Sequence, residues 1–271
     1  MRLILNKLPA ILLLKEGIDM IAEQRYQLIL SIVNQSNSAT VQQLADALDT
    51  SESTIRRDLI SLDQQGKLRR VHGGAAAIDG QFFAEEDDML TKQSRNVQAK
   101  QSIGTYAAGL ILPEDFVYID AGSTTLELVR AIQGDALRAT YVTNGLSHSR
   151  ILARKGCTVY VLSGKVKNTT EAIVGTQALE RLKQYSFTKA FLGANGVTLD
   201  KGYSTSGVEE VEVKAEAVRS SREHWFLADE SKFGKLHAAV ICELESCPLI
   251  TNRLPNPAFR EHTTVKETEL L

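Results

Sequence analysis

The sequence predicts an α/β protein with two domains: a small helical domain that carries a β-wing, and a larger domain built on a mostly parallel sheet. Two observations support this prediction. Between Thr40 and Gly74, apolar residues repeat at helical spacing in two short segments that a turn separates, and a basic hairpin follows. From Phe116 onward, short β-branched or aromatic runs alternate with helical stretches, which is typical of a parallel sheet covered on both faces.

The composition excludes several classes of protein. A net charge of −2 over 271 residues does not fit a wholly basic nucleic-acid coat. The three cysteines form no CxxC pair and no disulfide framework, and the five histidines lie at no zinc-ligand spacing from them. Because the sequence has no secretory signal, we expect reduced thiols, no metal, no cofactor and a cytoplasmic location.

The first nineteen residues form an unusual apolar segment. Leu3 to Leu14 is too short to span a bilayer, and no small-residue cleavage site follows it. Met20 stands directly before the first expected helix. We therefore expect residues 1–19 to be an N-terminal extension, and we expect no membrane partner.

The first domain is expected over residues 20–77 and contains three helices. The apolar positions of the first helix, over residues 21–35, are Ile21, Leu28, Ile32 and Val33. Thr40 and Gln43 form a capping box that starts the second helix. Its buried stripe is Val41, Leu44, Ala45 and Leu48. After a turn at residues 49–51, the third helix buries Ile55, Leu59 and Leu62 and ends at Gly66.

A basic hairpin follows the third helix. Lys67, Arg69 and Arg70 alternate with Leu68 and Val71, which predicts a half-buried strand with its charges outward, and His72-Gly73-Gly74 supplies the turn. This is the plan of a winged helix-turn-helix, whose second helix enters the DNA major groove. The candidate DNA contacts are Thr40, Ser51, Ser53, Thr54, Arg56, Arg57, Lys67, Arg69, Arg70 and His72.

Another use of this domain stays open. Two amphipathic helices joined by a turn occur in many folds, and residues 20–77 carry as many acids as bases, so a protein-contact role is the alternative. The local cluster of basic side chains between Arg56 and His72 favours DNA, because arginine has forked donors that match guanine.

The second domain is expected over residues 96–255, after a linker at 78–95 and before a C-terminal tail at 256–271. The acidic run at 85–88 is expected to be solvated surface, and residues 89–111 to be helical up to Pro113. The expected strands are FVYID, TYVT, TVYVL, KAFLG, WFLA, AVICEL and PLITN, with helices over 124–133, 145–155, 175–184 and 208–221. Polar clusters follow the strands, so they should converge on one crevice beyond the carboxyl ends of the sheet.

That crevice is expected to bind a phosphorylated ligand. Asp120-Ala121-Gly122-Ser123-Thr124-Thr125 lies between a strand and a helix, where backbone N–H groups and hydroxyls would point at an anion. The further candidates are Asn144 and Asn195 for sugar hydroxyls, and Lys165 and Lys232 as counter-charges. A capped strand-to-helix turn and surface lysines are the alternative interpretation. Glu209 and Glu210 are weaker candidates for contact with a sugar hydroxyl, and they are expected to face solvent.

Two series of motifs resemble a known family. Arg25-x3-Ile29, S-x-S-T-I-R-R-D-L over 51–59 and G-K-L-x-R-V-H-G-G resemble the N-terminal signature of DeoR-type bacterial transcriptional regulators. Residues 90–252 resemble their effector domain, which in turn is similar to ribose-5-phosphate isomerase. The G-S-T-T loop at 122–125 and the D-x-S-K segment at 229–232 match that enzyme family, but Leu192-Gly193-Ala194-Asn195 stands where the isomerase has D-G-A-D. The loss of those acids implies a sensor without catalytic residues.

The resemblance also implies a ligand and an assembly. Segments such as LSGKVKNTTEAIVGTQALE are most similar to fructose-operon repressors of Gram-positive bacteria, which implies fructose 1-phosphate as inducer. Lactose-system repressors share the T-E-A-[FI]-V-G segment and imply tagatose 6-phosphate instead. Operator DNA and a phosphorylated sugar are the expected partners. A homo-oligomer, a dimer or a tetramer, is expected because paired modules meet half-sites about one helical turn apart.

Overall fold

The computed structural model describes residues 22–36, 38–76, 81–83 and 87–268, so the expected extension at 1–19 lies outside the described residues. The chain divides into two compact units, Met1–Ala77 and Ile78–Leu271. Among the described residues, none of the helices combines the length and the apolar character that crossing a bilayer requires.

The N-terminal unit is the winged helix-turn-helix that the sequence predicts. Its elements are α1 (Ala22–Ser36), β1 (Ser38–Thr40), α2 (Val41–Ala47), α3 (Glu52–Gln64), β2 (Arg69–Val71) and β3 (Gly74–Ala76). The predicted capping box is present, since Thr40 Oγ1 accepts from Gln43 N and Gln43 Oε1 accepts from Thr40 N. The predicted inward residues of α2 and α3 are buried in one core.

A buried ion pair joins the first and third helices. Arg25, on α1, donates to both carboxylate oxygens of Asp58, on α3, at 2.5 and 3.1 Å. Arg25 and Asp58 both belong to the motifs that resemble DeoR-type regulators, and the pair gives them a structural role: it fixes the crossing of α1 over α3. The side chain of Asp58 is therefore unavailable to DNA, although Arg56 and Arg57 directly before it are exposed.

The wing differs from the prediction in one respect. The sequence predicts a half-buried strand with Leu68 and Val71 inward, but all three residues of β2 are exposed, and Val71 is 44 % exposed. Only Leu68, directly before the strand, enters the core. The reason is that β2 is the edge of a three-stranded antiparallel sheet in the order β1-β3-β2, whose central strand β3 packs on the helices.

The C-terminal unit is built on a seven-stranded parallel sheet. The strands, in spatial order, are β17 (Val265–Glu267), β16 (Leu249–Thr251), β13 (Ser221–Leu227), β10 (Phe187–Gly193), β5 (Phe116–Ile119), β6 (Thr140–Thr143) and β7 (Thr158–Val161). The chain runs from β5 outward to β7 and then returns to β10 on the other side of β5. The order of the strands therefore reverses between β5 and β10, which is where open α/β sheets bind ligands.

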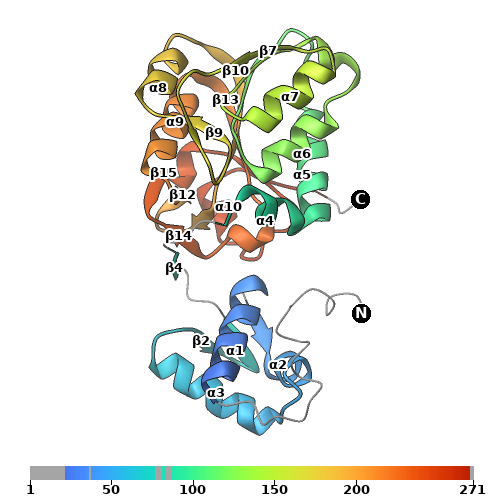
Figure 1. Ribbon diagram of the computed structural model, residues 1–271. Helices are drawn as coiled ribbons and strands as arrows, with labels where there is room; N and C mark the ends of the chain where they lie inside the picture. The colour runs from blue at the N-terminus through green and yellow to red at the C-terminus, as the bar shows by residue number, and fades with distance from the viewer. Residues whose placement is uncertain (1–21, 37, 77–80, 84–86, 269–271) are drawn as a thin grey trace. The chain divides into compact units, whose positions relative to one another are not determined.

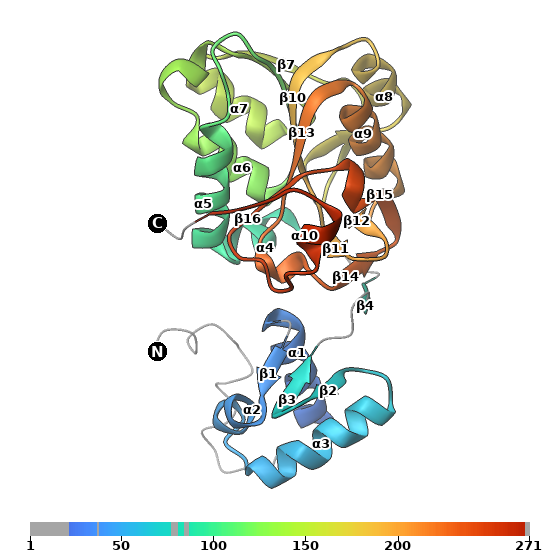
Figure 2. The ribbon, with the colours of Figure 1, turned by 180° about the vertical axis from the view of Figure 1, so that it is seen from behind.

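Helices cover both faces of this sheet (Figures 1 and 2). On one face lie α5 (Val97–Ala108), α6 (Ser123–Ala131) and α7 (Leu146–Arg154); on the other lie α8 (Thr176–Leu182) and α9 (Val208–Arg219). Alternate residues of the strands enter the two cores. Val117 and Ile119 pack on the α5–α7 side, and Tyr118 between them packs on the α8–α9 side. The expected mostly parallel sheet is confirmed.

Small β-elements surround the carboxyl ends of the sheet. They are the hairpin β8 (Lys165–Lys167) and β9 (Ala172–Val174), the antiparallel sheet of β11 (Gly196–Thr198), β12 (Gly202–Thr205) and β15 (Ala239–Cys242), and the parallel pair β4 (Gln81–Phe83) and β14 (Lys235–His237). Short helical segments complete the unit: α4 (Met89–Ser94), η2 (Gly134–Arg138), η3 (Glu230–Lys232), η4 (Leu244–Ser246) and α10 (Phe259–His262).

Three expectations about individual elements were wrong. AVICEL does form a strand, β15, but it pairs with β12 and not with the main sheet. Residues 89–111 form two helices, α4 and α5, because Asn96 adopts a left-handed conformation with φ +52°. The residues expected to form a C-terminal tail contain α10 and the edge strand β17.

Candidate anion pocket and nucleic-acid interface

A pocket lies at the point where the strand order reverses, beyond the carboxyl ends of β5 and β10. Its walls come from the β5–α6 loop, the end of β10, the β8–β9 hairpin, α4, α9 and η3. The residues that line it are Met89, Lys92, Ala121, Gly122, Ser123, Thr124, Thr170, Gly193, Ala194, Asn195, Thr205, Glu210, Lys214 and Lys232. Most of its side chains are therefore polar, and three of them are lysines.

The N-terminus of α6 opens into this pocket. Gly122 is the N-cap residue, and it provides no side-chain acceptor for the first turn, so the first N–H groups of the helix have no acceptor from a capping side chain. Ser123 and Thr124 line the pocket beside them. Free N–H groups and the positive end of the helix dipole favour an anion at this position.

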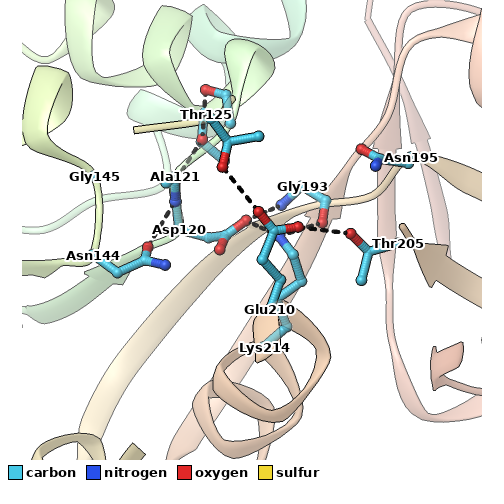
Figure 3. Close-up of polar contacts among 12 residues, drawn as sticks. Asp120, Ala121, Thr125, Asn144, Gly145, Gly193, Asn195, Thr205, Glu210 and Lys214 are labelled. Carbon is cyan, nitrogen blue, oxygen red and sulfur yellow. Dashed lines mark hydrogen bonds and ion pairs between the residues drawn. The ribbon is translucent and has the colours of Figure 1, made fainter. Parts of the chain in front are cut away.

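Asp120 lies beneath the loop and binds protein groups. Its Oδ2 accepts from Gly193 N at 3.0 Å and from the ammonium of Lys214, which also donates to Gly193 O at 3.0 Å (Figure 3). Burial raises the pKa of the Asp120 carboxyl, and the nearby Lys214 opposes that rise. Asp120 thus joins the end of β5 to the end of β10, and Lys214 of α9 balances its charge.

Asn144 and Thr125 also hold the loop from beneath. Asn144 Oδ1 accepts from Ala121 N at 2.8 Å. Thr125 Oγ1 donates to Asp120 O at 2.6 Å and is 3.1 Å from Nε2 of His148, on α7. Burial lowers the pKa of His148 to about 3, so the ring is neutral and its Nε2–H can donate to Thr125. These residues position the pocket-facing residues of the loop.

Glu210 faces the pocket and not solvent, so the expectation for this residue was wrong. It is buried at the start of α9, and its carboxylate accepts from Thr205 Oγ1 at 3.1 Å, Thr170 Oγ1 at 2.9 Å and Lys167 Nζ at 3.1 Å. Glu209 is exposed as expected. The two residues differ because α9 packs on the sheet with Glu210 and Lys214, four residues apart, on its inner face.

The remaining candidate ligand residues separate into two groups. Lys232 lines the pocket, and Asn195 does so with its Nδ2 donating to Ser206 Oγ at 2.8 Å. Lys165 is exposed, pairs with Glu209 at 2.9 Å and lies outside the lining. Asp229, which precedes Lys232, is fully buried; burial alone would raise its pKa, but Lys232 and the Ser231 hydroxyl outweigh it and lower the pKa.

Sequence reasoning missed several residues of the pocket. They are Met89, Lys92, Thr170 and Lys214 from the lining, and His148 beneath it. Of these, only Lys214 left a signal that could have been used, its spacing of four from Glu210 on one helix. Among the described residues, no group of three or more histidine, cysteine, aspartate or glutamate side chains could hold a metal ion.

The candidate DNA-contact residues lie on α3 and the wing, apart from Thr40 at the start of α2. All are exposed except Thr54, which is half-buried. Ser51 is the N-cap of α3, and its Oγ accepts from Thr54 N at 3.2 Å. Arg56 forms an exposed pair with Glu52 one turn earlier, at 2.5 Å. Thr40 and Ser51 therefore also cap the N-termini of helices. The other candidates form an exposed basic surface that includes Arg57, Lys67, Arg69 and His72.

A winged helix-turn-helix joined to a parallel α/β unit with a basic pocket defines a class of protein, the DNA-binding regulators that carry a sensor domain. Family models agree with that assignment: residues 25–81 match the DeoR-like helix-turn-helix domain, and residues 95–253 match the DeoR C-terminal sensor domain. The chain belongs to the DeoR family of transcriptional regulators.

Several curated relatives are similar over most of the chain. An uncharacterized HTH-type transcriptional regulator FruR of Bacillus subtilis is 37 % identical over 250 residues, which cover 91 % of this chain and 98 % of that protein. A lactose phosphotransferase system repressor of Staphylococcus epidermidis is 34 % identical over 219 residues, covering 80 % and 86 %. The HTH-type transcriptional repressor GlcR of Bacillus subtilis is 30 % identical over 256 residues, covering 93 % and 96 %. All three relatives are described as regulators or repressors.

Solved structures are similar at a lower level. Ribose 5-phosphate isomerase A of Methanocaldococcus jannaschii shares 17 % identity with a TM-score of 0.38, over 51 % of this chain and 54 % of that one. The sorbitol operon regulator SorC of Klebsiella pneumoniae shares 13 % identity with a TM-score of 0.37, over 81 % and 96 %.

Proposed function

We propose that this protein is a repressor of a sugar-utilisation operon, that it binds operator DNA through residues 20–77, and that a phosphorylated sugar such as fructose 1-phosphate relieves repression. The observation that supports this most directly is the pocket, which combines a helix N-terminus, hydroxyl groups and lysines at the ligand-binding edge of the sheet. The resemblance of residues 162–180 to fructose-operon repressors supports fructose as the sugar whose use is controlled.

The pocket offers different groups to the two ends of such a ligand. The phosphate would bind the N–H groups of Ser123 and Thr124, with Lys232 as counter-charge. The sugar hydroxyls would meet Asn195 and Glu210. The Glu210 carboxylate has about four acceptor sites, and the protein donors described above do not fill them. A sugar phosphate, anionic at one end and rich in donors at the other, matches this arrangement.

The DNA interface that we propose uses α3 and the wing. The side chains of Ser53, Arg56 and Arg57 in the first turns of α3 would reach base edges, as recognition helices do. Lys67, Arg69, Arg70 and His72 would bind phosphates of the backbone. We propose that the protein acts as a dimer or a tetramer in the bacterial cytoplasm, because two modules are needed to meet paired half-sites.

Two alternative functions are compared with this proposal. A repressor of the lactose and tagatose pathway would sense tagatose 6-phosphate, as the similarity to lactose phosphotransferase system repressors allows. A sugar-phosphate isomerase is the second, because Glu210 places a carboxylate in the pocket that could accept a proton. Against it, Leu192 is buried in the core and cannot ionise, and Asn195 is an amide.

One experiment separates these functions. The thermal midpoint of the purified chain is measured with fructose 1-phosphate, fructose 6-phosphate and tagatose 6-phosphate, and each mixture is then analysed for conversion of the sugar. A ligand at one hundred times its Kd stabilises by about 2.7 kcal/mol, which moves the midpoint by a few degrees. We expect fructose 1-phosphate to give the largest shift and no sugar to be converted; a larger shift with tagatose 6-phosphate favours the lactose pathway, and turnover favours the isomerase.

A further inference from the structure

The helix α4 lies outside both of the residue ranges that match the family models. The helix-turn-helix match ends at residue 81 and the sensor match begins at residue 95, and α4 (Met89–Ser94) lies between them. It is the first helix of the C-terminal unit after the segment that leads from the DNA-binding unit. Yet Met89 and Lys92 both line the pocket. A piece of the connection between the domains is thus part of the candidate ligand site.

The contacts of α4 attach it to the pocket wall. Met89 is buried, and its N–H donates to Thr169 O at 2.9 Å, next to the pocket residue Thr170. Lys92 Nζ donates to Asn195 Oδ1 at 3.4 Å. That distance is at the long end for a hydrogen bond, and the acceptor is a neutral amide. A phosphate oxygen is a stronger acceptor for an ammonium group than an amide oxygen is, so a ligand can draw Lys92 away from Asn195.

The connecting segment has a second attachment beside the pocket. β4 (Gln81–Phe83), just after the DNA-binding unit, pairs in parallel with β14 (Lys235–His237), and the Phe83 ring stacks on the His237 ring at 5.7 Å. β14 follows the short helix that ends at Lys232, the pocket lysine. Both described parts of the segment between the matched domains are therefore attached to residues that lie close in the chain to the pocket residues Thr170 and Lys232.

We propose that Lys92 is a direct ligand of the phosphate and that α4, fixed by Lys92 and Met89, passes the occupancy of the pocket to the segment that leads to the DNA-binding unit. This inference rests on the proposed function, and it concerns how ligand binding at the same site regulates DNA binding. With no ligand, Lys92 binds Asn195. With the sugar phosphate present, Lys92 binds the anion together with the N-terminus of α6, and the ligand binds more tightly to the state in which α4 is closed on it.

The test uses the full chain and three variants. Lys92→Gln removes the charge, Lys92→Arg keeps it, and Lys183→Gln removes an exposed charge outside the pocket lining. Ligand affinity is measured by the thermal shift with fructose 1-phosphate, and operator release by the anisotropy of a labelled operator duplex. Hydrogen exchange of the α4 amides is measured with and without the sugar.

We expect Lys92→Gln to bind the operator as the unsubstituted chain does, to bind the sugar about tenfold or more weakly, and to release DNA poorly even at saturating sugar. Lys92→Arg should recover part of the response, and Lys183→Gln should behave as the unsubstituted chain. The sugar should slow exchange at the amides of α4 in the unsubstituted chain and in Lys183→Gln, but not in Lys92→Gln. If the unsubstituted chain binds no sugar phosphate, the proposed function fails; if it does bind, but Lys92→Gln responds normally or α4 exchange is unchanged, this inference alone is overturned.

Discussion

The ammonium of Lys214, on the inner face of α9, hydrogen-bonds the carboxylate of Asp120 at the end of β5 (Figure 3). The two side chains are 7 % and 2 % exposed, and Lys214 also binds the Gly193 carbonyl of β10. A helix that covers one face of the sheet therefore fixes the positions of two neighbouring strand ends. The pocket depends on this contact, because its floor is formed by those two strand ends.

Loss of the Lys214 ammonium should destabilise the C-terminal unit. Lys214→Met leaves the Asp120 carboxylate buried without its partner, and breaking a buried pair in this way costs about 3–5 kcal/mol. Adding Asp120→Asn removes the uncompensated charge, so the double variant should recover a large part of that loss. Urea unfolding, followed by circular dichroism, gives both free energies of unfolding; a double variant no more stable than Lys214→Met would show that the charge is not the cause.

His148 should make the C-terminal unit sensitive to acid. Its pKa is about 3 in the folded chain and near the ordinary value of 6.5 in the unfolded chain, so only the unfolded chain takes up a proton between these values. Stability should therefore fall as the pH falls from 6.5 toward 3, by up to about 1.4 kcal/mol per pH unit from this group. His148→Gln keeps an N–H donor for Thr125 but cannot titrate, so its free energy of unfolding should fall less steeply between pH 6.5 and 4. Equal slopes for the two proteins would contradict this assignment.

The residues of α3 and the wing should affect DNA binding in different ways. If Arg56 reads a base, Arg56→Ala should cost about 1–3 kcal/mol and relax specificity at one position of the operator. If Arg70 binds phosphate, Arg70→Ala should weaken binding to all sequences and reduce the slope of log Kd against log salt by about one. Anisotropy titrations at several salt concentrations, with single-base variants of the operator, measure both effects. A loss with Arg70→Ala on one sequence only would assign base reading to the wing.

Lys232→Gln should separate the two functions of the chain. Lys232 lines the pocket in the C-terminal unit, while the proposed DNA contacts all lie in the other unit. The variant should bind the operator with unchanged Kd. The sugar phosphate concentration needed to release the operator should rise about tenfold or more, because a charge-assisted hydrogen bond to the phosphate is lost. Lys183→Gln is again the matched control. A variant that responds like the unsubstituted chain would exclude Lys232 from the phosphate site.

The periodicity of the sequence predicted local helices and strands well, but it predicted contacts between distant residues poorly. The helices of the N-terminal unit and the first strands of the parallel sheet follow from spacing and caps, such as the Thr40 capping box. The position of Glu210 does not follow from its neighbourhood, because adjacent acids look alike until α9 is placed against the sheet. Asp58 and Lys214 show the same limit: each is a charged residue on a helix whose burial depends on a partner 33 or 94 residues away.

The candidate pocket could be predicted only in the loops that follow strands directly. Gly122, Ser123, Thr124, Asn195 and Lys232 come shortly after strands, where polar residues after an apolar run indicate the carboxyl edge of a sheet. Lys165 follows a strand too, but its strand β7 is at the edge of the sheet, far in strand order from the point of reversal. Met89 and Lys92 come from a segment that follows no strand of the parallel sheet, and only the folded chain brings them to the site.

We propose that a phosphorylated sugar bound in the C-terminal unit controls DNA binding by the N-terminal unit. The most direct test is an anisotropy titration of the full chain, bound to a labelled duplex from its own genomic neighbourhood, with fructose 1-phosphate and with inorganic phosphate as control. We predict saturable release of the duplex by the sugar phosphate at concentrations where inorganic phosphate has no effect. A complex whose Kd is the same with and without every sugar phosphate of the panel would contradict the account.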